Sequence, residues 1–375
     1  MTLNGDKMKV LFVTNVPSPY RLDFFNELGK YCDLTVCFER RRASDRDDKW
    51  QGEKAVNYKS VQLNMTSYKS DMSIGSALKN YIKRNTFDII IFTNYASPAV
   101  MSAISYCRNH GIRYFLEYDG GFYKKDKALV RFVKKHLLCA AVGHFTTCKE
   151  HEKYLVSLGI PQNKIWKYPF TSVREADIKR AQALIASDKE MLRNKLSMSE
   201  ERIVLAVGQF IHRKGFDVLL EAAKGLGKNV GVYIVGGEPT EEYLAIQAKY
   251  NLKNVHFVGF KTKDELIEYY TASDIFVMPT REDIWGLVVN EAMSYGLPVV
   301  SSDKCIAALE MVSNGINGYI VPVDDSDKLL DKINKVLNNN ALREDMATQS
   351  GIVVQNYTIE KMAKRHIEIF AELFR

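Results

Sequence analysis

Short apolar runs alternate with amphipathic stretches along the whole chain. In the first half the apolar runs predict strands at residues 9–13, 33–38, 88–92, 113–118 and 144–147. Between them, a 3.6-residue periodicity predicts helices at 20–31, 74–85, 99–110, 124–138 and 149–158. Continuous apolar strands that alternate with helices are typical of a parallel sheet covered on both faces.

The same alternation restarts after a polar stretch at 175–201. It predicts strands at 202–207, 230–235, 255–258, 275–278 and 298–301, and helices at 216–226, 241–250, 265–272 and 287–295. A chain of 375 residues usually exceeds one core. We therefore expect an α/β protein with two tandem Rossmann-like, doubly wound domains facing a central cleft. The expected domains are 1–172 and 173–357, with the amphipathic segment 358–375 packed back on the first.

Composition narrows the class of protein. No apolar run approaches the roughly 18 residues of a membrane span, and the first residues lack the core of a signal peptide. The six cysteines (Cys32, Cys37, Cys107, Cys139, Cys148 and Cys305) contain no C-x-x-C and indicate buried, reduced thiols. We therefore expect a cytoplasmic protein.

The net charge of +7 is modest, but one segment, 124–138, concentrates cations among apolar residues. Its cations are Lys124, Lys125, Lys127, Arg131, Lys134 and Lys135, and its apolar residues are Leu129, Val130, Phe132, Val133, Leu137 and Leu138. Such a helix can lie on the anionic inner face of a membrane. Alternatively, its apolar stripe packs on the sheet and its lysines are solvated. No nucleic-acid-binding motif accompanies the charge, so a nucleic-acid partner is not expected.

The segment from Pro279 to Val300 concentrates candidate chemistry in the second half. Asp283 and Glu291 stand eight positions apart, just over two helical turns, so both are expected to point toward one cleft. Free amides after Gly286 would open a helix and bind an anion such as phosphate. Carboxylates beside an anion site suit a nucleotide sugar. The alternative is an amphipathic helix with ordinary surface acids.

A second candidate loop, 208–215, connects a strand to a helix and carries Arg213 and Lys214, whose charges could neutralise a diphosphate. Gly236, after the next strand, either permits close approach of a ligand or forms a plain turn. Neither half has G-x-G-x-x-G after its first strand, which argues against a nicotinamide dehydrogenase. Two D-x-D matches, Asp45-Arg46-Asp47 and Asp325-Ser326-Asp327, are interpreted as structural, so no metal site is expected.

In the first half, Asp119 follows a predicted strand and could orient or deprotonate an acceptor hydroxyl. Asn15, Ser18 and Arg21 follow the first strand and could line the acceptor side. Turn formation and helix capping explain these four residues equally well.

Three motifs resemble those of the family 4 glycosyltransferases, which have the GT-B fold. V-G-Q-F-I-H-R-K-G at 207–215 is similar to the family's V-G-R-L-x-x-x-K-G. D-I-W-G-L-V-V-N-E-A-M at 283–293 is similar to E-G-F-G-L-x-x-x-E-A-M, the E-x(7)-E motif. N-G-I-N-G-Y-I-V-P at 314–322 is similar to d-G-x-N-G-x-L-V-P. The resemblance extends over nearly the whole chain.

The resemblance implies a retaining, metal-independent enzyme that moves a sugar from a nucleoside diphosphate to a saccharide or lipid-linked saccharide. It implies an acceptor-binding first domain and a donor-binding second domain, with Asp119, Asp283 and Glu291 as catalytic residues. The implied donor residues are Gln209, Arg213, Lys214, Gly236, Glu282, Ile284, Trp285, Gly286, Leu287, Val288 and Glu291. The family's phosphate-binding arginine is Gln209 here, its first acid is Asp283, and its glycine pair after P-V-V is replaced around Cys305. A GT-B nucleotide-sugar epimerase and a non-catalytic two-lobed solute- or nucleotide-sugar-binding protein stay open as alternatives.

Overall fold

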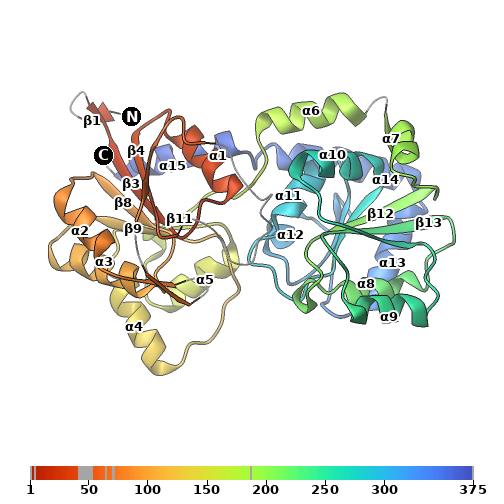
Figure 1. Ribbon diagram of the computed structural model, residues 1–375, viewed down its shortest axis with the longest axis horizontal. Coiled ribbons are helices and arrows are strands. Elements are labelled where there is room, and N and C mark those ends of the chain that lie inside the picture. Colours follow the sequence, from red (N-terminus) through yellow and green to blue (C-terminus); the bar gives the residue numbers. More distant parts are fainter. Residues whose placement is uncertain are drawn as a thin grey trace. The chain divides into compact units, whose positions relative to one another are not determined.

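A computed structural model of the chain describes residues 2–3, 6–40, 54–63, 66–69, 72–185 and 188–373. The chain forms two compact units, Met1–Thr171 with Ile359–Arg375, and Ser172–Thr358. Each unit contains a parallel sheet with helices on both faces (Figure 1). The predicted α/β class with two doubly wound domains is confirmed.

The first unit is built on a seven-stranded sheet of order β11-β10-β9-β8-β3-β4-β5, with every pair parallel. Its strands are β3 (Lys9–Thr14), β4 (Asp33–Phe38), β5 (Lys59–Gln62), β8 (Ile89–Phe92), β9 (Tyr114–Glu117), β10 (Gly143–Thr146) and β11 (Ile165–Lys167). The five predicted strands are present, and the pattern missed both edge strands. Edge strands are short and half exposed, so they carry no continuous apolar run.

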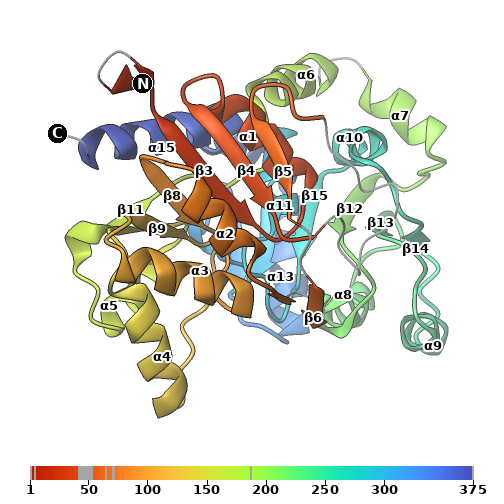
Figure 2. The same cartoon turned by 60° about the vertical axis from the view of Figure 1, so that its left-hand side comes forward.

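Helices α1 (Pro19–Leu28) and α15 (Ile359–Leu373) pack against each other on one face of this sheet, as Figures 1 and 2 show. The other face carries α2 (Ala77–Arg84), α3 (Pro98–Asn109), α4 (Ala128–Leu138) and α5 (Lys149–Ser157). The unit also contains η1 (Gln162–Lys164) and two short hairpins, β1 (Thr2–Leu3) with β2 (Asp6–Lys7) and β6 (Thr66–Lys69) with β7 (Met72–Ile74).

The basic helix is shorter than predicted. It begins at Ala128, not at residue 124, because Lys127 has an extended backbone and Asp126 pairs with Lys134 and Tyr154. Its apolar stripe is divided: Leu137 and Leu138 are buried, whereas Leu129 and Phe132 are 75% and 69% exposed. The alternative, in which the apolar stripe packs on the sheet, therefore holds for Leu137 and Leu138 but not for Leu129 and Phe132.

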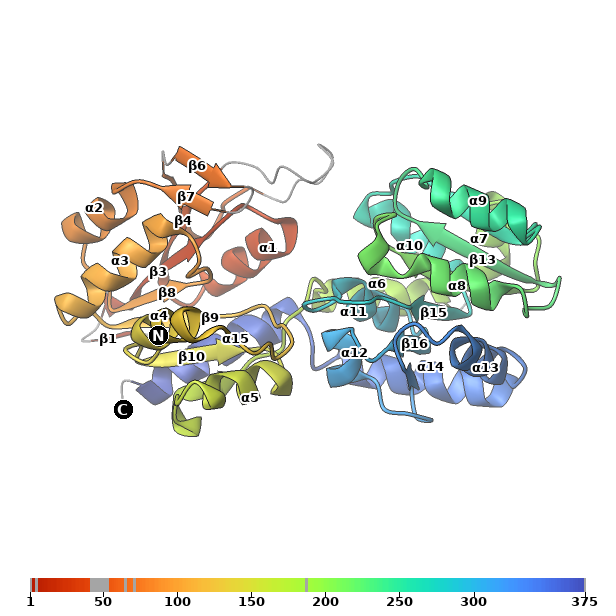
Figure 3. The same ribbon diagram turned by 90° about the horizontal axis from the view of Figure 1, so that it is seen from below.

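The second unit has a parallel six-stranded sheet of order β14-β13-β12-β15-β16-β17. Figure 3 shows β13, β15 and β16 of this sheet among the helices of the unit. Its strands are β12 (Arg202–Val207), β13 (Val230–Val235), β14 (Val255–Val258), β15 (Ile275–Met278), β16 (Val299–Ser302) and β17 (Gly318–Val321). Its helices are α6 (Glu175–Ile185), α7 (Lys189–Lys195), η2 (His212–Lys214), α8 (Phe216–Ala223), α9 (Glu241–Lys249), α10 (Lys263–Ala272), α11 (Leu287–Ser294), α12 (Ile306–Met311), α13 (Ser326–Leu337) and α14 (Asn340–Val354). Helices α8, α9 and α13 enclose one core with the sheet.

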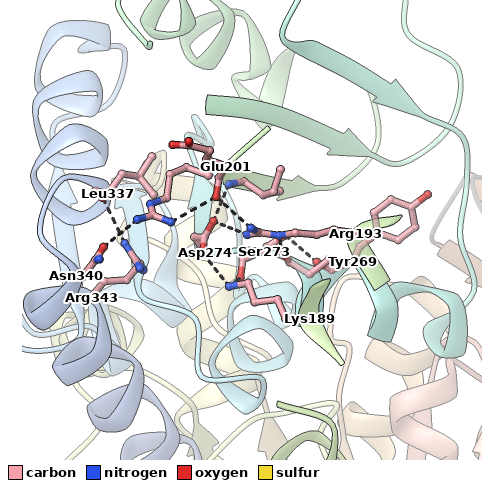
Figure 4. A network of polar contacts seen from close by, with 12 residues as sticks. Lys189, Arg193, Glu201, Tyr269, Ser273, Asp274, Leu337, Asn340 and Arg343 are labelled. Atoms are coloured by element: carbon pink, nitrogen blue, oxygen red, sulfur yellow. Dashed lines mark hydrogen bonds and ion pairs between the residues drawn. The ribbon is translucent and has the colours of Figure 1, made fainter. Parts of the chain in front are cut away.

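The polar stretch 175–201 contains two helices, α6 and α7, that its composition did not predict. Helix α7 is attached to the sheet by charge: Lys189 and Arg193 each lie 2.7 Å from the buried carboxylate of Asp274 (Figure 4). The same carboxylate accepts the backbone N–H of Ile203 at 2.7 Å. Polar contacts therefore replace the apolar stripe by which a helix is usually recognised.

All six cysteines are free thiols, and five are buried; Cys139 is exposed, unlike the predicted buried thiol. Among the described residues, every helix is too short or too polar to cross a bilayer.

Candidate active site

In the second unit, two loops follow the adjacent central strands β12 and β15, where the order of the sheet reverses. Ligands of doubly wound sheets bind beyond the carboxyl ends of strands at such a point. The carbonyl of Arg213 joins the loops, because it accepts the N–H of Arg281 and the hydroxyl of Thr280, each at 2.8 Å. Gly215 has φ +67°, and a Cβ there would lie 2.1 Å from the Pro279 carbonyl oxygen. Only glycine fits this close crossing.

The crossing brings Lys214 and Asp283 together. The Lys214 ammonium lies 2.6 Å from the Asp283 carboxylate, and the Arg213 guanidinium lies 3.6 Å from it. Arg213 also donates to the carbonyl of Glu282 at 2.6 Å. The two predicted cations and the first predicted acid therefore form one cluster. A diphosphate that bound Lys214 would compete with Asp283 for it.

Glu291 lies on α11 and has different partners. It accepts the Ser172 hydroxyl at 2.7 Å and the Tyr270 hydroxyl at 3.0 Å, and burial raises its pKa. The expected helical spacing between Asp283 and Glu291 is wrong, because Asp283 precedes the helix and bridges by its backbone to Cys305. Ser172 and Tyr270 escaped prediction, since they lie far from Glu291 in sequence and outside its motif.

Helix α11 begins after Gly286, which has φ +100° and whose Cβ would lie 2.6 Å from the Cys305 sulfur. The first-turn amides of Leu287 and Val288 have no acceptor within the helix, as at any helix start. Cys305, which replaces a glycine of the family pattern, thus fills the space behind Gly286.

The neighbouring residues Ile284 and Trp285 differ in exposure. Ile284 is 54% exposed, whereas Trp285 is buried and donates its indole N–H to Asn290 at 2.8 Å. The Trp285 side chain therefore packs inside the unit, whereas that of Ile284 is exposed to solvent.

Gly236 has a structural requirement of its own. A Cβ at this position would lie 1.7 Å from the carbonyl oxygen of Gly208, so the glycine permits the ends of β12 and β13 to approach. The partly buried Gln209 follows Gly208 at the same edge. Asp325 caps α13 by accepting the N–H of Lys328, as predicted, and Asp45-Arg46-Asp47 lies outside the described residues.

In the first unit, Asp119 follows β9 and its side chain is 35% exposed. Its carboxylate forms an ion pair with the guanidinium of Arg21 and accepts a hydrogen bond from the Tyr20 hydroxyl at 3.5 Å. Burial and Glu117 raise the pKa of Asp119, and Arg21 opposes that shift. Arg21 is buried between Asp119 and Glu117, so it reaches an acceptor only through Asp119.

The other two residues expected on the acceptor side lie in the turn after β3. Ser18 is buried at the start of α1, and the Asn15 side chain accepts the N–H of Val16 at 2.8 Å. Local turn geometry therefore accounts for much of what these two residues do.

A family model described as "Glycosyl transferases group 1" matches residues 188–351. An uncharacterized glycosyltransferase of Haemophilus influenzae is 27% identical over 319 residues, which are 84% of this chain and 85% of that protein. These matches indicate a glycosyltransferase whose residues 188–351 match the group 1 model. This glycosyltransferase is also 25% identical, over 66% of each chain, to the N,N'-diacetylbacillosaminyl-diphospho-undecaprenol alpha-1,3-N-acetylgalactosaminyltransferase of Campylobacter jejuni.

Its fold matches that of Anabaena HepE in complex with UDP, with a TM-score of 0.78 at 16% identity over 97% of this chain and 100% of that one. The glycosyltransferase therefore has the predicted GT-B fold. The matched segment 188–351 includes Lys214, Asp283 and Glu291.

Proposed function

We propose that this glycosyltransferase is a retaining, metal-independent enzyme that transfers a sugar from a nucleoside diphosphate to a saccharide or lipid-linked saccharide. The observation that carries the proposal is the Lys214–Asp283 pair beside the start of α11. It combines a cation and helix amides for a diphosphate with a carboxylate for sugar hydroxyls. Glu291, with its hydroxyl partners, is the group proposed to hold the donor ribose.

In the proposed reaction, the acceptor oxygen attacks the anomeric carbon on the face from which the diphosphate leaves. The bond from carbon to the acceptor oxygen forms as the bond to the diphosphate oxygen breaks, and the acceptor proton passes to the leaving phosphate. Lys214, Arg213 and the α11 amides stabilise the charge that develops on that phosphate. Asp119 orients the acceptor hydroxyl.

Independence from a metal rests on the same cluster. Lys214 and Arg213 supply positive charge where a divalent ion would otherwise bind the diphosphate.

We assign the enzyme to surface polysaccharide or glycolipid synthesis, because the Campylobacter jejuni relative acts on a diphospho-undecaprenol-linked sugar. Helix α4 offers a contact for a membrane that holds such an acceptor. Its exposed Leu129 and Phe132 stand among exposed lysines, including Lys127 and Lys135. Exposed apolar side chains surrounded by cations are typical of peripheral contact with anionic lipid.

The donor site is tested by a thermal shift with UDP, GDP, ADP and CMP, on the native chain, Glu291→Ala and the exposed control Asp331→Asn. A nucleotide at a hundredfold excess over its Kd stabilises the fold by about 2.7 kcal/mol. We expect one nucleotide to stabilise the native chain and Asp331→Asn but not Glu291→Ala. Release of that nucleotide from its sugar conjugates then tests for transfer. The absence of any shift at millimolar nucleotide would overturn the proposal.

The membrane contact is tested by sedimentation with phosphatidylglycerol vesicles at low salt. We expect the native chain to sediment and the double variant Leu129→Ser, Phe132→Ser to stay in solution. A matched control, Leu244→Ser with Ile352→Ser, removes two exposed apolar residues of the second unit and should still sediment. Equal sedimentation of both double variants would exclude α4 as the contact.

A further inference from the structure

The carboxylate of Asp119 is the exposed end of a chain of charged side chains inside the first unit. The guanidinium of Arg21 on α1 donates hydrogen bonds from one nitrogen to Asp119 and from the other to Glu117, at the end of β9. The other oxygen of Glu117 lies 2.9 Å from Nε2 of His366 on α15. The side chains of Glu117 and His366 are fully buried, and that of Arg21 is 2% exposed.

The partners of His366 define its protonation state. Its Nδ1 lies 2.8 Å from the carbonyl oxygen of Met362, and its Nε2 lies 2.9 Å from the carboxylate of Glu117. A carbonyl and a carboxylate only accept hydrogen bonds, so both ring nitrogens must donate. A ring that donates at both nitrogens carries a positive charge, so the four side chains then alternate as cation, anion, cation, anion.

The aromatic neighbours of His366 fix the direction of its ring. The Phe145 ring stacks on it with 5.2 Å between ring centroids and 5° between ring planes, and the ring centroids of Phe24 and Tyr168 each lie 4.8 Å from that of His366. The ring cannot turn without disturbing this packing, so its Nε2 stays directed at Glu117. A buried ion pair needs such geometry to offset its desolvation.

The alternation of charge matters because Glu117 and Asp119 share one arginine. Arg21 and His366 hold the pKa of Glu117 near 2 despite its burial, so Glu117 is an anion at neutral pH. Without the charge of His366, two carboxylates would compete for the guanidinium. Asp119 would then lose orientation, and its own charge would be less well neutralised.

We propose that His366, through Glu117 and Arg21, is a positioning residue for Asp119. This inference deepens the proposed function, since it rests on Asp119 facing the acceptor. It gives α15 a role beyond packing. The chain builds all of the second unit between Asp119 and this helix, and then returns to the first unit to complete the support of that carboxylate.

The protonation state of His366 is tested without activity, by 15N NMR of the histidine rings in the full-length protein at pH 7. We expect both nitrogens of His366 to be protonated, and His366→Gln to identify its signals. We also expect that variant to raise the midpoint of the Asp119 titration, followed by 13C NMR, by about one pH unit. The groups that face Asp119 in this titration are Tyr20, Arg21 and Glu117. A neutral ring would overturn the proposal.

The kinetic test uses the nucleotide sugar that supports transfer in the assay above. We expect His366→Gln to lower kcat about tenfold to a hundredfold, as for loss of one charge-assisted contact, with an unchanged KM for the donor. Phe370→Leu is the matched control, because Phe370 packs on His366 from the same helix but has no polar link to Asp119. It should lower thermal stability and leave kcat per folded molecule unchanged.

A double variant separates positioning from folding. Glu117→Gln together with His366→Gln removes both charges, so Arg21 and Asp119 remain as a balanced pair. We expect kcat of the double variant to exceed that of His366→Gln by about tenfold. If kcat of the double variant is lower than that of His366→Gln, His366 has only a structural role. The same conclusion follows if Phe370→Leu lowers kcat as much as His366→Gln does. Binding of free nucleotide should be unchanged in all variants, so failure there would count against the proposed donor site instead.

Discussion

The pairing of Lys214 with Asp283 predicts an unusual effect of removing the acid. The two groups lie 2.6 Å apart, and their side chains are only 12% and 14% exposed. Asp283→Asn keeps the size of the side chain but removes its charge. A free nucleoside diphosphate would then meet a lysine that is no longer neutralised. Asp283→Asn should therefore bind nucleotide more tightly while transferring sugar more slowly.

The magnitude follows from the geometry. Two charges at 2.6 Å attract by about 6 kcal/mol at an effective dielectric constant of 20, and desolvation offsets most of this. Hydrogen bonds to charged groups contribute a net of about 1.5–3 kcal/mol, and asparagine keeps the neutral part. We expect about 1.4 kcal/mol in favour of the nucleotide, or roughly tenfold in Kd. Lys214→Met should have the opposite effect and weaken binding about tenfold to a hundredfold.

Isothermal titration calorimetry with the nucleotide found by thermal shift measures both changes. Asp217→Asn is the matched control, because Asp217 at the start of α8 pairs at 2.5 Å with Arg281 of the loop that carries Asp283. If Asp283→Asn and Asp217→Asn weaken binding equally, loosening of the loops explains the effect. If Asp283→Asn weakens binding as much as Lys214→Met, the idea of competition is refuted.

Three further predictions concern stability. Glu117 has a pKa of about 2 in the folded protein, against an ordinary value of 4.5, and this difference corresponds to roughly 3 kcal/mol of stability. That stability should be fully present above pH 4.5 and lost as the pH falls through 2, and urea unfolding at several pH values measures the loss. In Gly215→Ala the added Cβ collides with the Pro279 carbonyl, and the backbone of residue 215 has φ +67°, which alanine disfavours. We expect the unfolding free energy to fall by about 1–3 kcal/mol or more and the nucleotide-induced thermal shift to be lost. Asp274→Asn leaves the cations of α7 without their buried anion and should destabilise by about 3–5 kcal/mol in chemical denaturation, while nucleotide binding per folded molecule is unchanged.

The central strands could be predicted because their sequences need no partner to be recognised. Residues 203–207, 230–235 and 275–278 contain no charged residue, and the structure confirms them as strands. The edge strand β14 was also predicted, although it contains His256. The missed edge strands β5, β11 and β17 are only three or four residues long, and β5 and β11 also contain polar residues. Helix α7 was missed because ion pairs of Lys189 and Arg193 with Asp274, not an apolar stripe, attach it to the unit.

The sequence predicted which loops carry the donor-side cluster, but not which of their side chains contact each other. Motif spacing identified Lys214 and Asp283 separately, and both follow strands. Their pairing depends on β12 lying next to β15, an order of strands that skips β13 and β14 along the chain. No local pattern contains that order. Likewise, the hydrogen bond from Ser172 to Glu291 joins residues that are 119 positions apart in the sequence.

In the first unit, the sequence pattern at the end of β9 indicates that its acidic residues need partners, although those partners are remote in the sequence. Glu117 and Asp119 stand at alternate positions at the end of a strand, so both side chains face the same side. An acid that ends an apolar run and is buried requires a cation, and a histidine on the apolar face of a terminal helix requires a polar partner. These two requirements satisfy each other here through Glu117 and His366, across 249 positions. The contact between Glu117 and His366 satisfies both requirements at once and joins α15 to the first unit.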